Sequence, residues 1–531
     1  MTAGIPDASL SDGNRGSVAG FLLFFIIAAA LAVHLVGIQR DLPYTPEADE
    51  PIFVKRSVCM ASSGSLNPGY FGNPGSTVFY PLAAAYHVWN AVAYDGPILQ
   101  ADPGLETRFE TNPSEFYLLG RLLTVSYAVM TVPLIYLVGR RLFGERVGLI
   151  ACGLFVLYPI AVTHAQMVRT DSAAAFFGAL SLWLCLRVYD RPTLGNHFLA
   201  GAAIGLAIAT RYFMAVLIPV LAGVNLLLWW RLIPGRQVVS AAWLKAGAGL
   251  LAVAIAFAAV TPYLFLDFSA AWASVEHEAR STHLGHDGLS PWENLVWYVR
   301  EAIPDGITWA QAGLAATGAG LVLWRRKPLE VLPLAVVAMF LVGISLSPLH
   351  WQRWLIPVLP LFALLVAYGL NEMIGWLSAR LRLAPVAARA LLVLAVFAVA
   401  AWPAYKLVLQ DMRQATPSTR VLARDWMLQH LSPGSKIAQE AYAAPLEGQP
   451  LVMPKTFTLS EHSLEDYRRD GLRYLVASSI MYDRYLAEPD RYPEAVRFYE
   501  RLFSEGRLVQ EFSPSRTRGG PTLRIYEILP R

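Results

Sequence analysis

Eleven long apolar runs, separated by short charged segments, constrain the fold of this chain more than any other feature. Their approximate residue ranges are 18–38, 117–138, 146–163, 172–189, 197–210, 213–230, 243–263, 308–324, 330–346, 354–373 and 388–405. A helix of about 20 apolar residues crosses the hydrocarbon core of a bilayer. Only 15% of the 531 residues are charged. The pattern predicts a polytopic α-helical membrane protein with about 11 transmembrane helices, the fifth and sixth joined in a tight hairpin at Thr210-Arg-Tyr212.

Basic residues in alternate loops predict the orientation of these helices. Loops on the cytoplasmic side of a membrane are enriched in Lys and Arg. The alternate loops carry Arg15; Arg140, Arg141 and Arg146; Arg187 and Arg191; Arg231, Arg236 and Lys245; Arg325, Arg326 and Lys327; and Arg380, Arg382 and Arg389. We therefore expect a cytoplasmic N-terminus, an uncleaved first helix and an extracytoplasmic C-terminus.

Four segments then fall on the outer side: 39–116, 164–171, 264–307 and 406–531. In the first, an apolar and aromatic helix at Pro81–Ala93 is too short to cross a membrane, which predicts an interfacial helix. Residues 1–405 form the predicted transmembrane module. The tail 406–531 regains charge and predicts a small extracytoplasmic α/β domain, with helices at Thr419–Leu431 and Pro493–Glu505 and strands at Lys436–Gln439, Tyr474–Ser478, Leu508–Phe512 and Leu523–Ile528.

Several classes of function lack their sequence signals. The net charge is only +4 and no basic patch interleaved with aromatic residues occurs, which excludes nucleic acid as a partner. The three cysteines, Cys59, Cys152 and Cys185, form no CxxC pair and predict no disulfide and no cysteine metal site. No nucleotide-binding loop stands in a supporting context. The reagents are therefore expected to arrive already activated on the outer face.

An acidic stretch follows the first apolar run. Glu47, Asp49 and Glu50 lie within Tyr44–Pro51, where the first helix reaches water. A carboxylate at this boundary can act as a general base on an acceptor hydroxyl or amine. The alternative is a set of solvated loop charges.

Ionisable residues also occur at the ends of later apolar runs. Arg169 and Asp171 precede the fourth run, where Arg suits a phosphate and Asp suits an acceptor or a metal; Thr170-Asp171 could instead cap the helix. His350 and Arg353 share a helix face and could clamp a lipid phosphate, or the arginine could snorkel beside tryptophans.

Two further features each allow two interpretations. Arg211, like Arg353, could bind a lipid phosphate or could snorkel to the membrane surface. The segment 276–287 holds three His and three acidic residues, but at no known metal-ligand spacing, which favours a solvated or substrate-facing loop.

Taken in order, these motifs resemble a known superfamily. The set is Asp49-Glu50, Arg140-Arg-Leu-Phe-Gly144, the run from Leu157 through Thr170-Asp171 to Phe177, and Arg353-Trp-Leu-Ile-Pro-Val-Leu-Pro360. It is similar to the GT-C membrane glycosyltransferases, in the branch of protein O-mannosyltransferases and bacterial aminoarabinose–lipid A transferases. The tail resembles the periplasmic domain of bacterial members, which implies a bacterial-type inner (plasma) membrane.

The resemblance implies a phospholipid carrier-dependent glycosyltransferase. Its donor would be a polyprenyl-phosphate sugar, its transfer inverting, and its acceptor a glycan, lipid or protein at the cell envelope. Asp49 would be the base or acceptor-orienting group, Glu50 its partner and Asp171 the second acid. The donor phosphate would contact Arg169, Arg211, His350 and Arg353, although Arg211-Tyr212 replaces the Lys-Tyr frequent in the family. Asp49 and Asp171 could share a divalent cation, Mg or Mn; we expect none to be obligatory.

Two other classes of function stay open at this stage. A transporter or flippase would carry its charges near the middle of the bilayer and often shows internal repeats. A non-catalytic envelope scaffold would leave the acidic pair idle. The enzyme hypothesis requires Asp49 and Asp171 to lie close together, with the cationic side chains around them.

Overall fold

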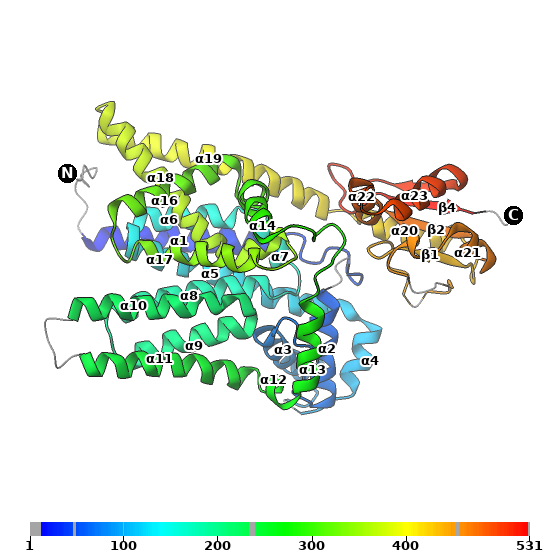
Figure 1. Ribbon diagram of the computed structural model, residues 1–531, viewed down its shortest axis with the longest axis horizontal. Coiled ribbons are helices and arrows are strands. Elements are labelled where there is room, and N and C mark those ends of the chain that lie inside the picture. Colours follow the sequence, from blue (N-terminus) through cyan, green and yellow to red (C-terminus); the bar gives the residue numbers. More distant parts are fainter. Residues whose placement is uncertain are drawn as a thin grey trace.

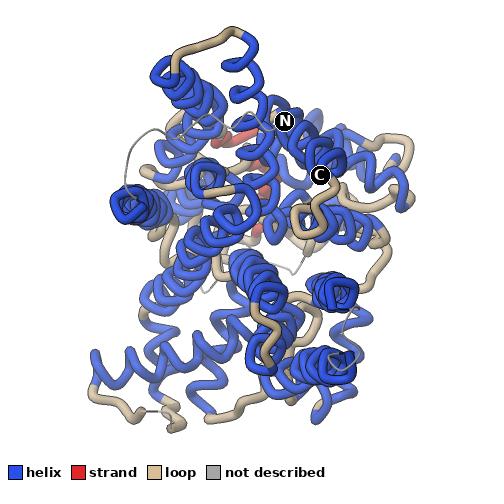
Figure 2. The backbone as a smooth tube through the Cα atoms, turned by 90° about the vertical axis from the view of Figure 1, so that its left-hand side faces the viewer, coloured by secondary structure: helices blue, strands red, loops and turns tan. Residues whose placement is uncertain are grey.

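A computed structural model gives the structure of residues 12–45, 49–98, 100–232, 239–447, 449–452 and 456–528. The molecule is mostly helical, with a bundle of long helices at one end and a small sheet domain at the other (Figure 1). Figure 2, turned by 90°, shows several helices of the bundle nearly end-on, with the strands of the sheet domain behind them.

The bundle contains the long helices and two 3₁₀ segments. They are α1 (Asp12–Leu35), α5 (Pro113–Phe143), α6 (Glu145–Val156), α7 (Pro159–Ala165), α8 (Asp171–Asp190), α9 (Leu194–Thr210), η1 (Tyr212–Val216), α10 (Leu217–Leu232), α11 (Val239–Val260), α16 (Trp309–Arg325), α17 (Val331–Ser345), η4 (Gln352–Val358), α18 (Leu359–Arg380) and α19 (Pro385–Gln414).

The apolar lengths of these helices confirm a multi-pass membrane protein. Among the described residues, seven helices are long and apolar enough to cross a bilayer, or nine if each of two bent pairs forms one span. The shorter apolar helices α9 and α17 occupy two further predicted positions. One bend, of 62°, separates α6 from α7. It occurs at Tyr158, whose backbone is extended because Pro159 follows it.

Two groups of shorter helices pack on the bundle. The first consists of α2 (Glu50–Ser63), α3 (Ser76–Tyr94), α4 (Gly104–Thr111), α12 (Tyr263–Leu266) and α13 (Phe268–Glu278). The second consists of α14 (Pro291–Trp297), the π-helix η3 (Tyr298–Ala302) and α15 (Ile303–Ile307), which pack against α16, α17 and η4. The predicted interfacial helix is α3, which begins five residues earlier than expected (76 against 81). Its residues Phe79, Leu82 and Tyr86 are fully buried in the protein, while Val92 remains exposed. One face of α3 is therefore part of the protein core.

The C-terminal domain is a four-stranded mixed sheet with helices. Its strands are β1 (Ile437–Gln439), β2 (Tyr474–Ser478), β3 (Arg507–Phe512) and β4 (Leu523–Glu527), in the order β1-β2-β4-β3, and its helices are α20 (Thr419–His430), η5 (Leu459–Glu461), α21 (Leu464–Arg469), α22 (Ser479–Ala487) and α23 (Pro493–Glu505). Only β1 and β2 pair in parallel. The predicted strands and helices are confirmed, but α19 continues past the predicted boundary at residue 405, to Gln414.

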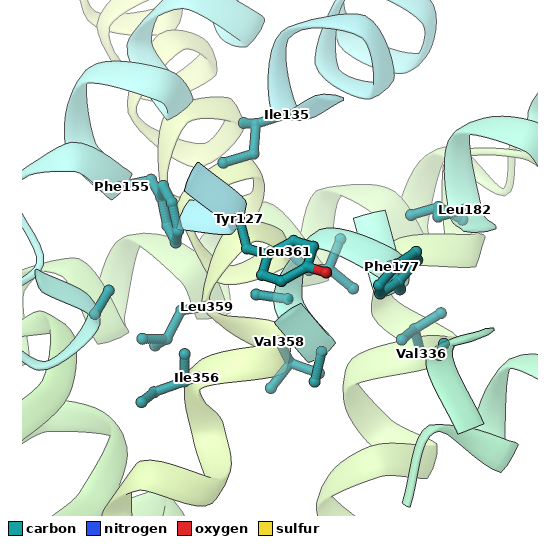
Figure 3. Packing of buried hydrophobic residues seen from close by; sticks show 14 of the residues in the cluster. Tyr127, Ile135, Phe155, Phe177, Leu182, Val336, Ile356, Val358, Leu359 and Leu361 are labelled. Carbon is teal, nitrogen blue, oxygen red and sulfur yellow. The ribbon is translucent and has the colours of Figure 1, made fainter. Parts of the chain in front are cut away.

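The core of the bundle surrounds α18. The most apolar stretch of η4 and α18 is 94% buried inside the protein. The corresponding stretches of α1 and α19 are only 17% and 11% buried, so their apolar surfaces are available to contact lipid. Figure 3 shows Leu361 of α18 packed near Tyr127 of α5, with Val358 and the α8 residue Phe177 close by. The enclosed helix packs most extensively against α16 and α6.

Close backbone contact between α16 and α18 depends on two glycines. A Cβ added at Gly369 would lie 2.2 Å from the carbonyl oxygen of Leu314, and one at Gly318 would lie 2.2 Å from that of Leu365. Backbone atoms cannot rotate aside as a flexible side chain can. The two helices pack at this distance only because both positions lack a side chain.

We predict that Gly369→Ala destabilises the bundle by about 1–3 kcal/mol, because the added methyl group overpacks the crossing. The measurement is the melting temperature of the detergent-solubilised protein. Gly375→Ala is the matched control on the same helix, since a Cβ there meets no atom within 4 Å. Equal melting temperatures for the two variants would contradict this account of the crossing.

Candidate active site

Two carboxylates from distant parts of the chain share one arginine. Asp49 directly precedes α2, and Asp171 is the first residue of α8. Arg169, in the turn between α7 and α8, donates through Nη2 to Asp49, and its Nε lies 3.6 Å from Asp171 Oδ2. The two carboxylates therefore lie close together with a cationic side chain between them, which is the geometry that the enzyme hypothesis requires.

Two further arginines complete this site. Arg211 donates to Asp171 Oδ1, and Arg353 Nη1 lies 3.5 Å from Asp49 Oδ2. We call these five residues, Asp49, Arg169, Asp171, Arg211 and Arg353, the acid–arginine cluster. Three guanidinium groups face two carboxylates in it, so the cluster carries an excess positive charge.

Breaks in the helices aim these arginines at one point. Arg211 stands between α9 and η1 with an extended backbone, and Arg353 lies in the 3₁₀ segment η4. Neither lies within a regular α-helix, which lets side chains from separate bundle elements converge. The helix breaks at the predicted position, between the end of α9 at Thr210 and the start of η1 at Tyr212, and this break supplies Arg211.

The two carboxylates differ in exposure. The side chain of Asp49 is 40% exposed, and that of Asp171 only 1%. Thr170 makes no capping hydrogen bond through its side chain, and Asp171 is bound by arginines instead. Asp49 is thus the carboxylate that a substrate can reach, while Asp171 orients Arg169 and Arg211.

Unused donors remain in the cluster. The Nε atoms of Arg211 and Arg353 are buried and have no hydrogen-bond partner among the described residues. A buried donor without a partner costs free energy that a ligand can recover. Excess positive charge and unpaired guanidinium N–H groups together favour an anion, and a phosphate oxygen has the matching geometry.

The charge balance also fixes the protonation state of Asp49. Burial alone would raise the pKa of this carboxyl, but the guanidinium groups of Arg169 and Arg353 outweigh it, so the pKa lies below its ordinary value. Asp49 is therefore ionised at neutral pH.

Glu50 does not join the cluster, although it is the next residue. It is fully buried and forms a two-pronged ion pair with Arg121 of α5, at 2.8 and 3.0 Å, and its Oε1 accepts a hydrogen bond from Val168 N. Sequence reasoning missed Arg121; its signal was a single arginine inside an apolar run. The pair holds the start of α2 against the turn that carries Arg169.

His350 also lies apart from the cluster. Its ring packs at 4.5 Å from Trp297 and 6.1 Å from His286. Burial lowers its pKa, so the imidazole is neutral at pH 7 and adds no positive charge for a phosphate. The neighbouring Trp351 instead contacts the cluster, with Arg353 lying 5.2 Å from its ring centre.

The segment 276–287 links the bundle to the C-terminal domain. His283 and His286 stack at 5.5 Å from each other and lie at 5.3 and 5.0 Å from Trp351. Burial lowers the pKa of His286 to about 3. Asp287 forms an ion pair of 2.8 Å with Arg491 of the sheet domain. These contacts give the segment a structural role.

The cluster does not fit a divalent cation. Both carboxylates are already bound by guanidinium groups, and a metal there would lie against three positive charges. Across the residues described, no three His, Cys, Asp or Glu side chains are grouped to hold a metal. Glu47, the third acid of the opening stretch, lies outside the described residues.

Comparison with known proteins agrees with this architecture. Residues 118–265 match the family model described as dolichyl-phosphate-mannose-protein mannosyltransferase. Among curated proteins, none matches the sequence of the chain.

Solved structures resemble the whole chain. ArnT from Cupriavidus metallidurans in the apo state superposes with a TM-score of 0.55 at 15% identity, over 96% of this chain and 98% of ArnT. The same protein bound to undecaprenyl phosphate gives 0.50 at 16% identity, over 95% and 97%. The oligosaccharyltransferase AglB from Archaeoglobus fulgidus, in complex with an inhibitory peptide and a dolichol-phosphate, gives 0.53 at 12% identity, over 95% and 74%. This multi-pass membrane protein therefore shares the fold of ArnT and AglB, the GT-C fold that its sequence motifs predicted.

Proposed function

We propose that this protein is an integral-membrane glycosyltransferase. It moves a sugar from a polyprenyl-phosphate donor to a cell-envelope acceptor on the outer face of a bacterial-type inner membrane, with inversion. One observation carries the proposal: Asp49 and Asp171 share Arg169, beside unpaired donors of Arg211 and Arg353.

The arginines of the cluster bind the donor phosphate. When the bond between the sugar and the phosphate breaks, negative charge develops on the departing lipid phosphate. Preorganised guanidinium groups in a poorly hydrated site stabilise that charge strongly. ArnT has been solved with undecaprenyl phosphate and AglB with a dolichol-phosphate, which supports a lipid phosphate as the ligand of this fold.

Asp49 acts as the base. It takes the proton of the acceptor hydroxyl while the hydroxyl oxygen attacks the anomeric carbon from the side opposite the phosphate. A glycosidic bond forms, the carbon–oxygen bond to the phosphate breaks, and polyprenyl phosphate leaves. A bound phosphate also offsets the positive charge of Arg169 and Arg353, which raises the basicity of Asp49 only when the donor is present.

The positions of the charges support an enzyme over a transporter. A transporter carries its binding charges near the middle of the bilayer. Asp171 is the first residue of α8, and Arg211 follows the last residue of α9. The acid–arginine cluster thus stands at helix ends.

We predict that Asp49→Asn lowers kcat by about 10²–10⁴-fold, the usual contribution of a general base. The measurement is transfer from radiolabelled polyprenyl-phosphate sugars to an envelope fraction, with expression and melting temperature unchanged. Glu106→Gln, an exposed acid on α4, is the control. Unchanged transfer by Asp49→Asn would remove Asp49 from the mechanism.

The pH dependence of the reaction tests the coupling between Asp49 and Arg353. Activity requires the ionised carboxylate and is lost as pH falls through its pKa. Arg353 lowers that pKa, so Arg353→Gln raises it, and the acidic limb of kcat/KM moves to higher pH. Arg280→Gln, which removes an arginine that pairs with Glu278, leaves the limb in place. An acidic limb that stays fixed in Arg353→Gln would show that Asp49 is not the titrating base.

Glu50 supports the site through the fold. Glu50→Gln leaves the buried Arg121 without its counter-charge, which costs about 3–5 kcal/mol. We expect a lower melting temperature than for Asp49→Asn, whereas turnover per folded molecule falls less. A double replacement of Glu50 and Arg121 by Met recovers part of the stability. A stable Glu50→Gln protein with no turnover would instead place Glu50 among the reacting groups.

A further inference from the structure

A cavity of about 480 Å³ lies where the helical bundle meets the sheet domain. One wall is the turn 37–44, which follows α1. The other wall is Gln414, the last residue of α19, with residues 415–417 and Val421 of α20. Figure 1 shows α19 leading from the bundle to this junction. The acid–arginine cluster includes none of these residues.

Gln414 is the unusual group in this cavity. Its side chain lines the cavity and is only 7% exposed, yet neither its amide nitrogen nor its amide oxygen has a hydrogen-bond partner among the residues described. Leaving such a group unpaired costs free energy that a ligand with hydrogen-bonding groups can recover. Gly37 makes room for it, because a Cβ at that residue would lie 2.1 Å from Gln414 Oε1. The chain thus keeps an unpaired amide at the wall of a cavity.

The rest of the lining defines the chemistry of the ligand. Arg40 and Asp41 bring one positive and one negative charge, which gives no preference for a strongly charged ligand. The amide of Gln414 offers donors and acceptors side by side, as neighbouring hydroxyl groups require. Leu42 and Val421 supply apolar surface for the C–H face of a ring. A neutral ligand with many hydroxyl groups satisfies all these features.

The cavity wall is tied to the candidate active site by one side chain. Arg121 donates to the carbonyl oxygens of Ile38 and Arg40, at 2.8 and 3.0 Å, and with its other nitrogens to Glu50. Glu50 is the first residue of α2 and follows Asp49 in the chain. One guanidinium group therefore joins the cavity wall to the residue that follows the proposed base in the chain.

We propose that this cavity binds sugar residues of a glycan acceptor, a role that rests on the proposed transfer at Asp49. The acceptor hydroxyl extends from the cavity toward Asp49, while the bound sugars hold the acceptor in place. Gln414 is the residue that recognises hydroxyl groups of the acceptor. The acceptor is accordingly a glycan or glycolipid, recognised through its carbohydrate.

The test uses the full-length protein in lipid nanodiscs. The probe is a fraction of soluble, delipidated oligosaccharides released from bacterial envelopes by mild acid, and binding is followed by saturation-transfer NMR. Gln414→Leu removes the amide at nearly constant volume, and Ala415→Trp fills the cavity from an exposed position. Met412→Trp is the control, because Met412 is exposed on α19 and does not line the cavity.

We expect Gln414→Leu to weaken oligosaccharide binding about tenfold, the loss of roughly two neutral hydrogen bonds. Ala415→Trp abolishes binding, and Met412→Trp leaves it unchanged. The melting temperature of Gln414→Leu does not fall, because the unpaired amide is replaced by an apolar group. In the transfer assay, the KM for the oligosaccharides rises in Gln414→Leu, rises further in Ala415→Trp and stays unchanged in Met412→Trp. Hydrolysis of the donor by water is retained in all three variants.

Three results would overturn the proposal. The wild-type protein does not bind the oligosaccharides, or all variants bind them equally. The third is that the protein binds an envelope peptide fraction and that Gln414→Leu and Ala415→Trp reduce this binding. Failure of the proposed function is seen separately. A wild-type protein that neither hydrolyses the lipid-linked donor nor transfers its sugar contradicts the enzyme, whereas the NMR measurement still decides whether the cavity binds glycans.

Discussion

The shared contact of Asp49 and Asp171 with Arg169 is the interaction on which the rest of the site depends. Asp171 and Arg169 have side chains that are 1% and 6% exposed, and burying either charge alone would cost several kcal/mol. Mutual pairing offsets this cost and fixes the turn between α7 and α8 against the start of α2. The site exists because these charges have no other way to be buried.

A second buried ion pair, Glu50 with Arg121, stabilises that arrangement. Arg121 binds Glu50 and the carbonyl groups of the turn after α1, and Gln166 donates to the carbonyl oxygens of His34 and Val36. These contacts join α1, α2, α5 and the turn before α8. Asp49 can remain 40% exposed and still keep its position, because its neighbour Glu50 is immobilised.

The sheet domain reaches the cluster through aromatic rings. Arg491 binds Asp287, which also accepts a hydrogen bond from His283 N at 2.7 Å. The rings of His283 and His286 pack on Trp351, and Arg353 lies over the same tryptophan. A domain that looks separate in the sequence therefore supports an arginine of the acid–arginine cluster.

Sequence patterns alone predicted a multi-pass helical protein, the strands of the C-terminal domain and the five residues of the acid–arginine cluster. Hydrophobic length and periodicity are local properties, and an ionisable residue at the end of an apolar run is conspicuous because burial is costly. The ion-pair partner of each charged residue could be read only from the folded chain. Glu50 and Arg121 are 71 residues apart, and Asp49 and Arg169 are 120 apart. Nothing local distinguishes Asp49 from Glu50, and only the packing of α2 against α5 turns one carboxylate toward the cluster and the other into the core.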